Sequence, residues 1–210
     1  MGFPTIFALF VIVALLFNYR LNKITRIERK AKVAYWETER DSLSVRRKDF
    51  AQEDYLRPDM TALTFPNLDV KDYDLVLYES LKSKILALSS KDMMNFSHLT
   101  NTEIRLQFGT ANQTTIADNE ANYNSYLKAL ADYGKFMNEQ GELPEAIAAL
   151  EECIRMKSEY SRHYLYLAQL FSTTKNEEAF HQLCEKASYI DATKQTNLRQ
   201  KLLDYWSTLN

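Results

Sequence analysis

The chain has 210 residues, with 26 basic and 28 acidic side chains and a net charge of −2. An apolar fraction of 46% argues against disorder along the whole length, and only four glycines and four prolines argue against collagen-like, β-sandwich and phosphate-loop designs. Two cysteines cannot form a disulfide framework, and the near-neutral charge excludes a polyanion binder over the whole surface, though not a local basic patch.

Residues 1–19 are predicted to form a transmembrane anchor. The run FPTIFALFVIVALLF occupies residues 3–17; thirteen of its fifteen residues are apolar and none is charged. A bilayer core requires a span of about 17–25 residues, and Tyr19 stands where an interfacial aromatic residue belongs. A cleaved signal peptide is the alternative, but no basic residue precedes the run and no A-x-A cleavage pattern follows it.

The charges behind this run predict its orientation. Residues 20–32 contain six basic residues and one acid, Glu28. Because Lys and Arg flanking a span stay on the cytoplasmic side, we expect a single pass through the cell membrane, with the N-terminus outside and the C-terminal domain in the cytoplasm. Reduced cysteines fit that compartment. The basic residues expected to face the lipid headgroups are Arg20, Lys23, Arg26, Arg29, Lys30 and Lys32.

Two segments separate the anchor from the rest of the chain. Residues 20–48 lack Gly and Pro and carry a net charge of +6, which leaves −8 for residues 49–210, so we expect a basic juxtamembrane helix. Contact with anionic lipid would stabilise it by about 1 kcal/mol per basic residue. A topology signal with a solvated charged face is a second interpretation, and a coiled-coil dimer stem is a third, for which the apolar pattern is short. Pro58 and Pro66 then predict an extended linker over residues 49–74.

The remainder of the chain is predicted to be helical, which makes the fold all-α. Residues 75–116 are expected to form an N-terminal helical cap in which Gly109 is a turn or helix stop. A long helix is expected from near Asp118 to Gly141. Residues 117–210 are expected to hold helical repeats and a C-terminal capping helix.

A shift of 34 residues aligns this region with itself. Two helices follow one another in each unit, and a small residue between large ones lets the helices of a unit approach closely. In the first helices, Leu130, Tyr133, Gly134 and Met137 align with Tyr164, Leu167, Ala168 and Phe171. In the second helices, Ala146, Leu150 and Cys153 align with Phe180, Cys184 and Ala187.

This pattern resembles the tetratricopeptide repeat (TPR), a helix-turn-helix unit of 34 residues, over residues 127–194. The stretch GELPEAIAALEECI is most similar to it, and Pro144 suits the first turn of its helix. The departures are Ser158 and Ala192 in place of the terminal Pro, Phe180 in place of a small residue, and Lys175 in place of a turn Gly. Two repeats need covered ends, and the predicted C-terminal capping residues are Leu198, Leu202, Tyr205 and Trp206.

The whole layout also resembles small membrane-anchored TPR proteins of clostridia-like bacteria, a group that brings no known activity. The resemblance rests on residues 36–49, which contain Trp36, Glu39 and the Arg46-Arg47-Lys48 cluster, and on residues 100–112.

The sequence offers no enzyme chemistry, and we expect no catalytic residue, no metal site and no cofactor. His181 and Cys184 are three residues apart on one helix, but Cys184 falls on the apolar face of the repeat, as Cys153 does. The net charge of −8 over residues 49–210 disfavours nucleic acid. The oligomeric state is left open.

The first helices of the two repeats are expected to line a groove for an unidentified protein or peptide. Cations and amides on that face would hold a carboxylate by charge-assisted hydrogen bonds, although an ordinary solvated face is the alternative. The residues are Lys128, Lys135, Asn138, Arg162, Gln169 and Thr173. The predicted function is a membrane-anchored scaffold; the alternatives are an enzyme with a cryptic site in its helical bundle and an exported helical binding protein.

Overall fold

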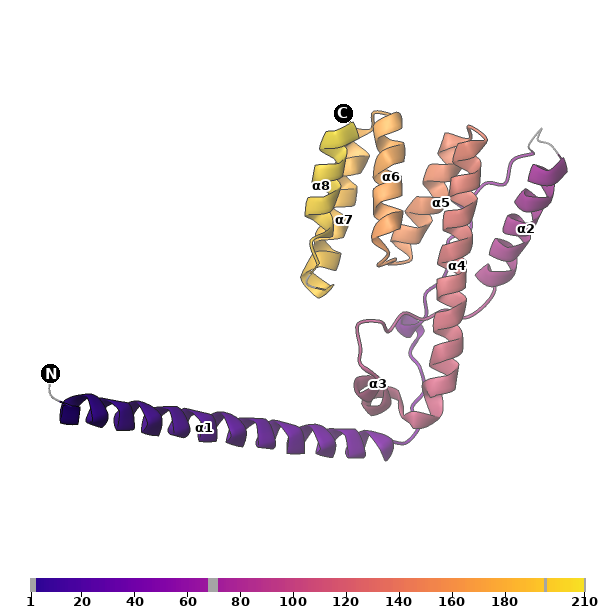
Figure 1. Ribbon diagram of the computed structural model, residues 1–210. Coiled ribbons are helices and arrows are strands. Elements are labelled where there is room, and N and C mark those ends of the chain that lie inside the picture. Colours follow the sequence, from indigo (N-terminus) through magenta and orange to yellow (C-terminus); the bar gives the residue numbers. More distant parts are fainter. Residues whose placement is uncertain (1–2, 68–71, 195, 210) are drawn as a thin grey trace. The chain divides into compact units, whose positions relative to one another are not determined.

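The computed structural model describes residues 3–67, 72–194 and 196–209, and every regular element in this part of the chain is helical (Figure 1). The predicted all-α class is therefore confirmed. Side chains are not described at residues 3–6, 8, 9, 14, 72, 73 and 193. The chain divides into two units, Met1–Asp49 with Leu99–Gln113, and Phe50–His98 with Thr114–Asn210.

The first unit consists of a long helix and a short one. Helix α1 (Phe3–Leu43) runs without interruption through the predicted anchor and most of the predicted stem, and it ends five residues before Lys48. Helix α3 (Asn101–Phe108) and the 3₁₀ turn η2 (Thr110–Asn112) complete the unit. Helix α3 begins with a capping box, in which Thr100 N donates to Glu103 Oε2 at 2.7 Å and Glu103 N donates to Thr100 Oγ1 at 3.3 Å.

Four polar side chains, which we call the α1–α3 clasp, hold α3 against the end of α1. Arg105 forms an ion pair with Glu39, which also accepts a hydrogen bond from the hydroxyl of Thr102. Arg105 Nε donates to Oγ of the fully buried Ser42 at 3.0 Å. The clasp joins the two segments, 36–49 and 100–112, that carry the second resemblance described above.

Gly109 ends α3 at a position that only glycine can occupy. Its φ of 82° and ψ of 155° lie in a region closed to other residues. A Cβ there would lie 2.5 Å from the carbonyl oxygen of Arg46. Asn112 Nδ2 stabilises the same close contact between the two backbone segments, because it donates to the carbonyls of Lys48 and Phe108 at 2.6 and 2.9 Å. The expected stop at Gly109 is thus also a close contact between two backbone segments.

The second unit contains the remaining helices. They are η1 (Gln52–Asp54), α2 (Asp72–Ser89), α4 (Gln113–Glu139), α5 (Leu143–Arg155), α6 (Ser161–Thr173), α7 (Glu177–Lys194) and α8 (Leu198–Leu209). Figure 1 shows α4 to α8 as consecutive antiparallel neighbours. Helix α4 starts five residues before the predicted Asp118, and α2 starts inside the predicted linker.

All fourteen residues aligned by the 34-residue shift are buried. Gly134 lets α4 approach α5 closely, because a Cβ at this position would lie 3.2 Å from the carbonyl oxygen of Ala146. The corresponding turns also agree in backbone conformation. Lys175 has a φ of 53° where Gly141, 34 residues earlier, has a φ of 86°, so a lysine in the second repeat adopts the left-handed turn that has glycine in the first repeat.

The predicted linker lies across the second unit as a strap, which we define as residues 55–66. Its backbone is held by side chains of the helices beneath it. Tyr133 and Tyr78 donate hydrogen bonds to the carbonyls of Thr64 and Pro66, each at 2.7 Å. The buried carboxylate of Glu152 accepts from Asp59 N at 2.9 Å. Leu63 is buried in the core, and Leu56, Met60 and Phe65 pack against it.

The ends of the helical stack are covered by different elements. At the α4 end, helix α2 packs against α4 beside the strap. The ring of Tyr78 from α2 stacks on the ring of Phe136 from α4, with the centroids 6.0 Å apart. Residues 99–113, which the sequence grouped with this cap, belong instead to the first unit. At the other end, α8 buries Leu198 and Leu202.

Candidate functional site

A cavity of about 450 Å³ lies between α4 and α6 on the predicted groove face. Four of the six predicted groove residues line it: Lys135 and Asn138 from α4, and Arg162 and Gln169 from α6. The wall also contains residues that the sequence reasoning missed, namely Ala131, Asp132, Glu139, Leu150, His163 and Tyr166. We call this site the α4–α6 groove.

The other two predicted residues do not line the groove. Lys128 forms an ion pair with Asp132 at 2.6 Å, one turn before the cavity. The hydroxyl of Thr173 donates to the carbonyl oxygen of Gln169 at 3.1 Å. The groove therefore contains two of the three predicted cations.

The charges in the groove are balanced. Lys135 lies 3.6 Å from Glu139, but both side chains are more than half exposed, so this ion pair contributes little and can open. The guanidinium of Arg162 lies 5.2 Å from the centre of the Tyr160 ring, and no ion pair to it occurs among the described residues. Arg162 is consequently the cation best placed to meet an anion.

Tyr166 of α6 and Asn138 of α4 lie on the two walls of the groove. Burial raises the pKa of Tyr166, and polar interaction with the Asn138 side chain opposes that shift. Together with Ala131 and Leu150, this tyrosine supplies the apolar part of the wall. A ligand in the groove would thus meet both apolar surface and polar groups, as is typical of binding sites.

His163 is the buried polar residue of the groove wall. Its side chain is 1% exposed, and Nδ1 lies 2.7 Å from Oγ of the fully buried Ser158. Nε2 is buried and has no hydrogen-bond partner among the described residues. Burial, helped by the charge of Arg162, lowers the pKa of His163 to about 4, so the imidazole is neutral at pH 7.

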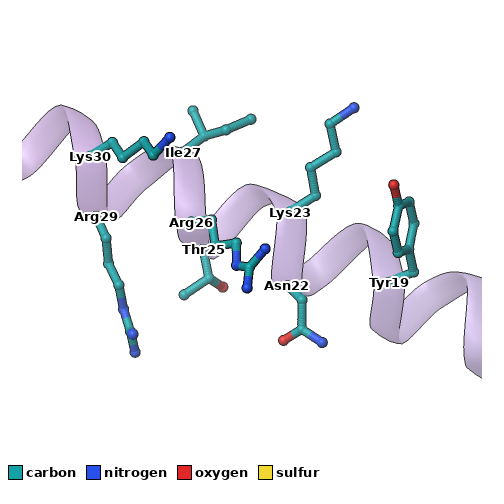
Figure 2. Close-up of a pocket in the computed structure, with 8 residues that line it drawn as sticks. All are labelled: Tyr19, Asn22, Lys23, Thr25, Arg26, Ile27, Arg29 and Lys30. Carbon is teal, nitrogen blue, oxygen red and sulfur yellow. The ribbon is translucent and has the colours of Figure 1, made fainter.

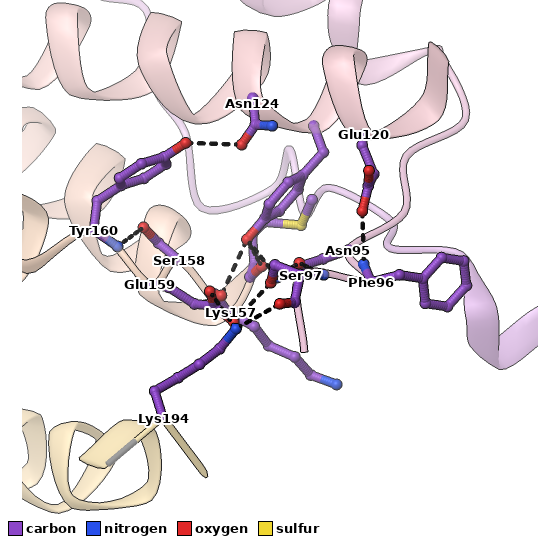
Figure 3. A network of polar contacts seen from close by, with 12 residues as sticks. Asn95, Phe96, Ser97, Glu120, Asn124, Lys157, Ser158, Glu159, Tyr160 and Lys194 are labelled. Atoms are coloured by element: carbon purple, nitrogen blue, oxygen red, sulfur yellow. Dashed lines mark hydrogen bonds and ion pairs between the residues drawn. The ribbon is translucent and has the colours of Figure 1, made fainter. Parts of the chain in front are cut away.

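A second cavity, of about 370 Å³, lies beside a network of polar side chains (Figure 3). Lys194 Nζ lies 3.1 Å from Glu159 Oε2 and donates to the carbonyl of Ser97 at 2.8 Å, while Ser97 Oγ donates to Glu159 Oε1 at 2.9 Å. The hydroxyl of Tyr123 lies 3.0 Å from the carbonyls of Met156 and Lys157. These groups satisfy one another and tie the loop at 95–97 to the loop at 156–159, which is a structural role.

The cysteines have the surroundings of core residues. Cys153 and Cys184 are both free thiols in the core, and burial raises the pKa of each. Cys153 Sγ contacts the carbonyl oxygen of Leu127 at 3.7 Å. In the part of the chain that is described, no three His, Cys, Asp or Glu residues gather in a way that would hold a metal ion.

Helix α1 carries the predicted lipid-facing residues on more than one side. Figure 2 shows Lys23 and Arg29 projecting from opposite sides of the helix, with Tyr19 on the side of Lys23. The predicted anchor, residues 1–19, falls partly outside the described residues. Among the described residues, no helix combines the length and the apolar character that crossing a membrane requires.

Comparisons with known proteins give no relative. No family model, no curated protein and no solved structure matches this chain.

Proposed function

We propose that the chain is a membrane-anchored scaffold whose cytoplasmic, TPR-like domain binds a carboxylate-bearing segment of a partner protein in the α4–α6 groove. The observation that carries this proposal is the cavity between α4 and α6, which gathers Lys135, Asn138, Arg162 and Gln169 from two helices. The role is binding and positioning, not catalysis.

The TPR-like character of the domain is supported by the agreement between sequence register and burial. In each aligned pair, both residues are buried, one in each helical hairpin; Gly134 of α4 and Ala168 of α6 are an example. Pro144 stands in the first turn of α5, as expected for the second helix of a repeat. In a two-hairpin stack of this kind, α4 and α6 are the first helices, and the groove lies on their side.

The anchor is supported by the side chains at the start of α1. The described apolar residues between Phe7 and Tyr19 are 38–70% exposed, and residues 20–32 follow with their excess of cations. Contiguous exposed apolar surface of this kind marks contact with a membrane or a partner. The basic residues behind it favour a cytoplasmic position for the rest of the chain.

Arg162 is the residue on which we place the recognition of a carboxylate. A guanidinium offers two parallel N–H donors to a carboxylate, and hydrogen bonds between charged groups are about twice as strong as neutral ones. Lys135 can add its charge when its exposed pair with Glu139 opens. Asn138 and Gln169 supply amide groups for the polar main chain of an extended segment.

The binding role is tested by affinity capture from a membrane fraction with the full-length chain as bait, comparing Arg162→Glu and Lys135→Glu with a matched control. Lys84→Glu is that control, because Lys84 is an exposed lysine of α2 that does not line the cavity and forms no ion pair among the described residues. We expect the two groove variants to lose a specific partner that the wild type and Lys84→Glu retain. Equal capture by all four chains would overturn the groove assignment.

The anchor is tested by alkaline carbonate extraction of membranes that contain the full-length chain or a chain lacking residues 1–19. We expect the full-length chain to stay in the membrane pellet and the shortened chain to be released. Protease added outside intact cells should leave residues 49–210 undigested. Digestion of that part of the chain would reverse the proposed topology.

A further inference from the structure

The part of α1 that follows the predicted anchor carries an apolar face that is exposed along its whole length. Every residue from 20 to 38 is exposed. Apolar residues recur in this stretch at spacings of three and four, which places them on one side of the helix. We call them the stem face: Leu21, Ile24, Ile27, Ala31 and Ala34. Its three large side chains are 46–58% exposed, and a row of such side chains marks a contact surface.

The same side of α1 packs against a helix at its C-terminal end. Ser42 follows Ala31 by eleven residues, about three helical turns, and therefore lies on the side of the stem face. Ser42 is fully buried, and Arg105 Nε of α3 donates to its hydroxyl in the α1–α3 clasp. The stem face is thus continuous with an existing helix–helix contact.

The continuity of α1 favours a protein over the membrane surface as the cover of the stem face. Helix α1 runs without a break from Phe3 to Leu43 (Figure 1), and residues 18–43 contain no Gly or Pro. Sharp kinks in helices almost always need such a residue or an irregular turn. If residues 1–19 span the bilayer, residues 20–43 continue along the same axis for about 36 Å, away from the lipid.

The charges beside the stem face fit a second copy of α1 in parallel orientation. In a parallel helix pair with Ile24 and Ile27 in its core, the residue before Ile24 lies opposite the residue five places later on the other helix. These residues are Lys23 and Glu28. Glu28 is the single acid between residues 20 and 32, and it stands where this register brings it to a lysine. One heptad later, Lys30 lies opposite Tyr35, whose ring attracts an ammonium group.

The remaining cations of the stem do not oppose this pairing. Arg20 stands at a core position, but it lies at the predicted membrane boundary, where its long side chain reaches the headgroups. The other five basic residues between 20 and 32 lie outside the core positions: Lys23, Arg26, Arg29, Lys30 and Lys32.

We propose that the stem face binds the stem of a second copy of this chain, in a parallel pair in which Lys23 of each copy lies opposite Glu28 of the other. The inference rests on the proposed anchor, which gives both copies the same orientation. Anchoring in one membrane also raises the effective concentration of the stems, so a short contact suffices. The pair carries two α4–α6 grooves, which strengthens the binding of a partner that has two suitable segments.

The test is disulfide cross-linking in membranes that contain the full-length chain with one added cysteine in the stem. The native Cys153 and Cys184 are buried, and the chain without an added cysteine measures their background. Under mild oxidation we expect a disulfide-linked dimer from each variant of the stem face: Ile24→Cys, Ile27→Cys and Ala31→Cys. A disulfide between the same residue of both copies, at several positions along the stem, forms only in a parallel pair in register.

Trp36→Cys and Val33→Cys are the matched controls on other sides of α1. Ile27 and Trp36 are 58% and 59% exposed, so access to the oxidant does not distinguish them. We expect the two controls to form little dimer. Equal cross-linking at Ile27 and Trp36 would show random collision and overturn the pair.

A charge exchange tests the register. Glu28→Lys should lower the cross-linking of Ile24→Cys about fivefold, because it replaces two attractive pairs by two repulsive ones. Adding Lys23→Glu to the same chain should restore it. Glu37→Lys is the control, since it makes the same exchange at an exposed acid of α1 beyond the stem face. Loss without restoration would overturn the pairing of Lys23 with Glu28.

Alkaline carbonate extraction of the same membranes separates this inference from the proposed anchor. A chain that stays in the pellet and forms no dimer overturns the pair and leaves the anchor intact. A chain that is released, yet forms dimer at the stem face alone, overturns the anchor and leaves the pair intact. Two further results would overturn the second copy as the occupant. One is a disulfide to a different protein, and the other is stronger quenching by spin-labelled lipid of a fluorophore on Ile27→Cys than on Trp36→Cys.

Discussion

The indole of Trp206 stacks on the ring of Phe180, with the centroids 4.0 Å apart and the planes inclined by 12°. Phe180 stands where the repeat pattern calls for a small residue, and it is almost fully buried. The stack joins α7 to α8, so the departure from the repeat pattern supplies the surface on which the last helix packs. The aromatic pair therefore closes this end of the helical stack.

Trp206→Ala should destabilise the second unit by about 2–3 kcal/mol, because it removes a large, partly buried side chain from Phe180. Phe180→Ala restores the small residue of the repeat pattern, yet it should also destabilise, since the indole loses its partner. Urea unfolding of both single variants and of the double variant measures the coupling, which we expect at about 0.5–1.5 kcal/mol. Additive effects would show that the stack contributes no energy of its own.

Tyr133→Phe should loosen the strap. The change removes the hydrogen bond to the carbonyl of Thr64 and leaves packing intact, so a loss of about 1 kcal/mol is expected. Tyr164→Phe is the matched control, because Tyr164 is equally buried in the core and its hydroxyl makes no hydrogen bond among the described residues. Hydrogen exchange of amides in residues 55–66 should quicken in the first variant alone; equal exchange in both would contradict this role.

The helix faces could be read from the sequence, because a buried helix face repeats every three to four residues. The same periodicity correctly placed four predicted residues on the groove wall: Lys135, Asn138, Arg162 and Gln169. Lys128 shares their face but lies seven residues before Lys135, about 10 Å farther along the helix axis, which places it beyond the cavity.

Contacts between residues far apart in the sequence, or in different elements, could not be predicted from helical periodicity. Tyr133 bonds to a carbonyl 69 residues away, and any residue at position 64 would offer the same carbonyl. The pairing of Glu39 with Arg105 spans 66 residues and likewise leaves no periodic signal. His163 gave no signal either, since its environment depends on Ser158, which lies outside α6.

Gly109→Ala should separate α3 from the end of α1. The methyl group would lie 2.5 Å from the carbonyl oxygen of Arg46, in a backbone conformation that disfavours any side chain, so we expect a cost of about 2 kcal/mol or more. Limited proteolysis between residues 99 and 113 measures it, and cleavage should be faster in the variant. Gly141→Ala is the control for a positive φ without a close contact, because no atom lies within 4 Å of a Cβ there. Unchanged cleavage in Gly109→Ala would contradict the close approach.

The folded chain should lose stability in mild acid through His163. Burial and the charge of Arg162 lower its pKa to about 4, against 6.5 for an ordinary histidine. Between these two pH values the unfolded state binds a proton that the folded state does not bind. The contribution of His163 to the free energy of unfolding is therefore complete above pH 6.5 and declines as the pH falls toward 4. The loss should reach about 3 kcal/mol at pH 4. Urea midpoints measured from pH 7.5 to pH 4.5 should fall more steeply in the wild type than in His163→Phe, and parallel curves for the two chains would show that another group controls the acid transition.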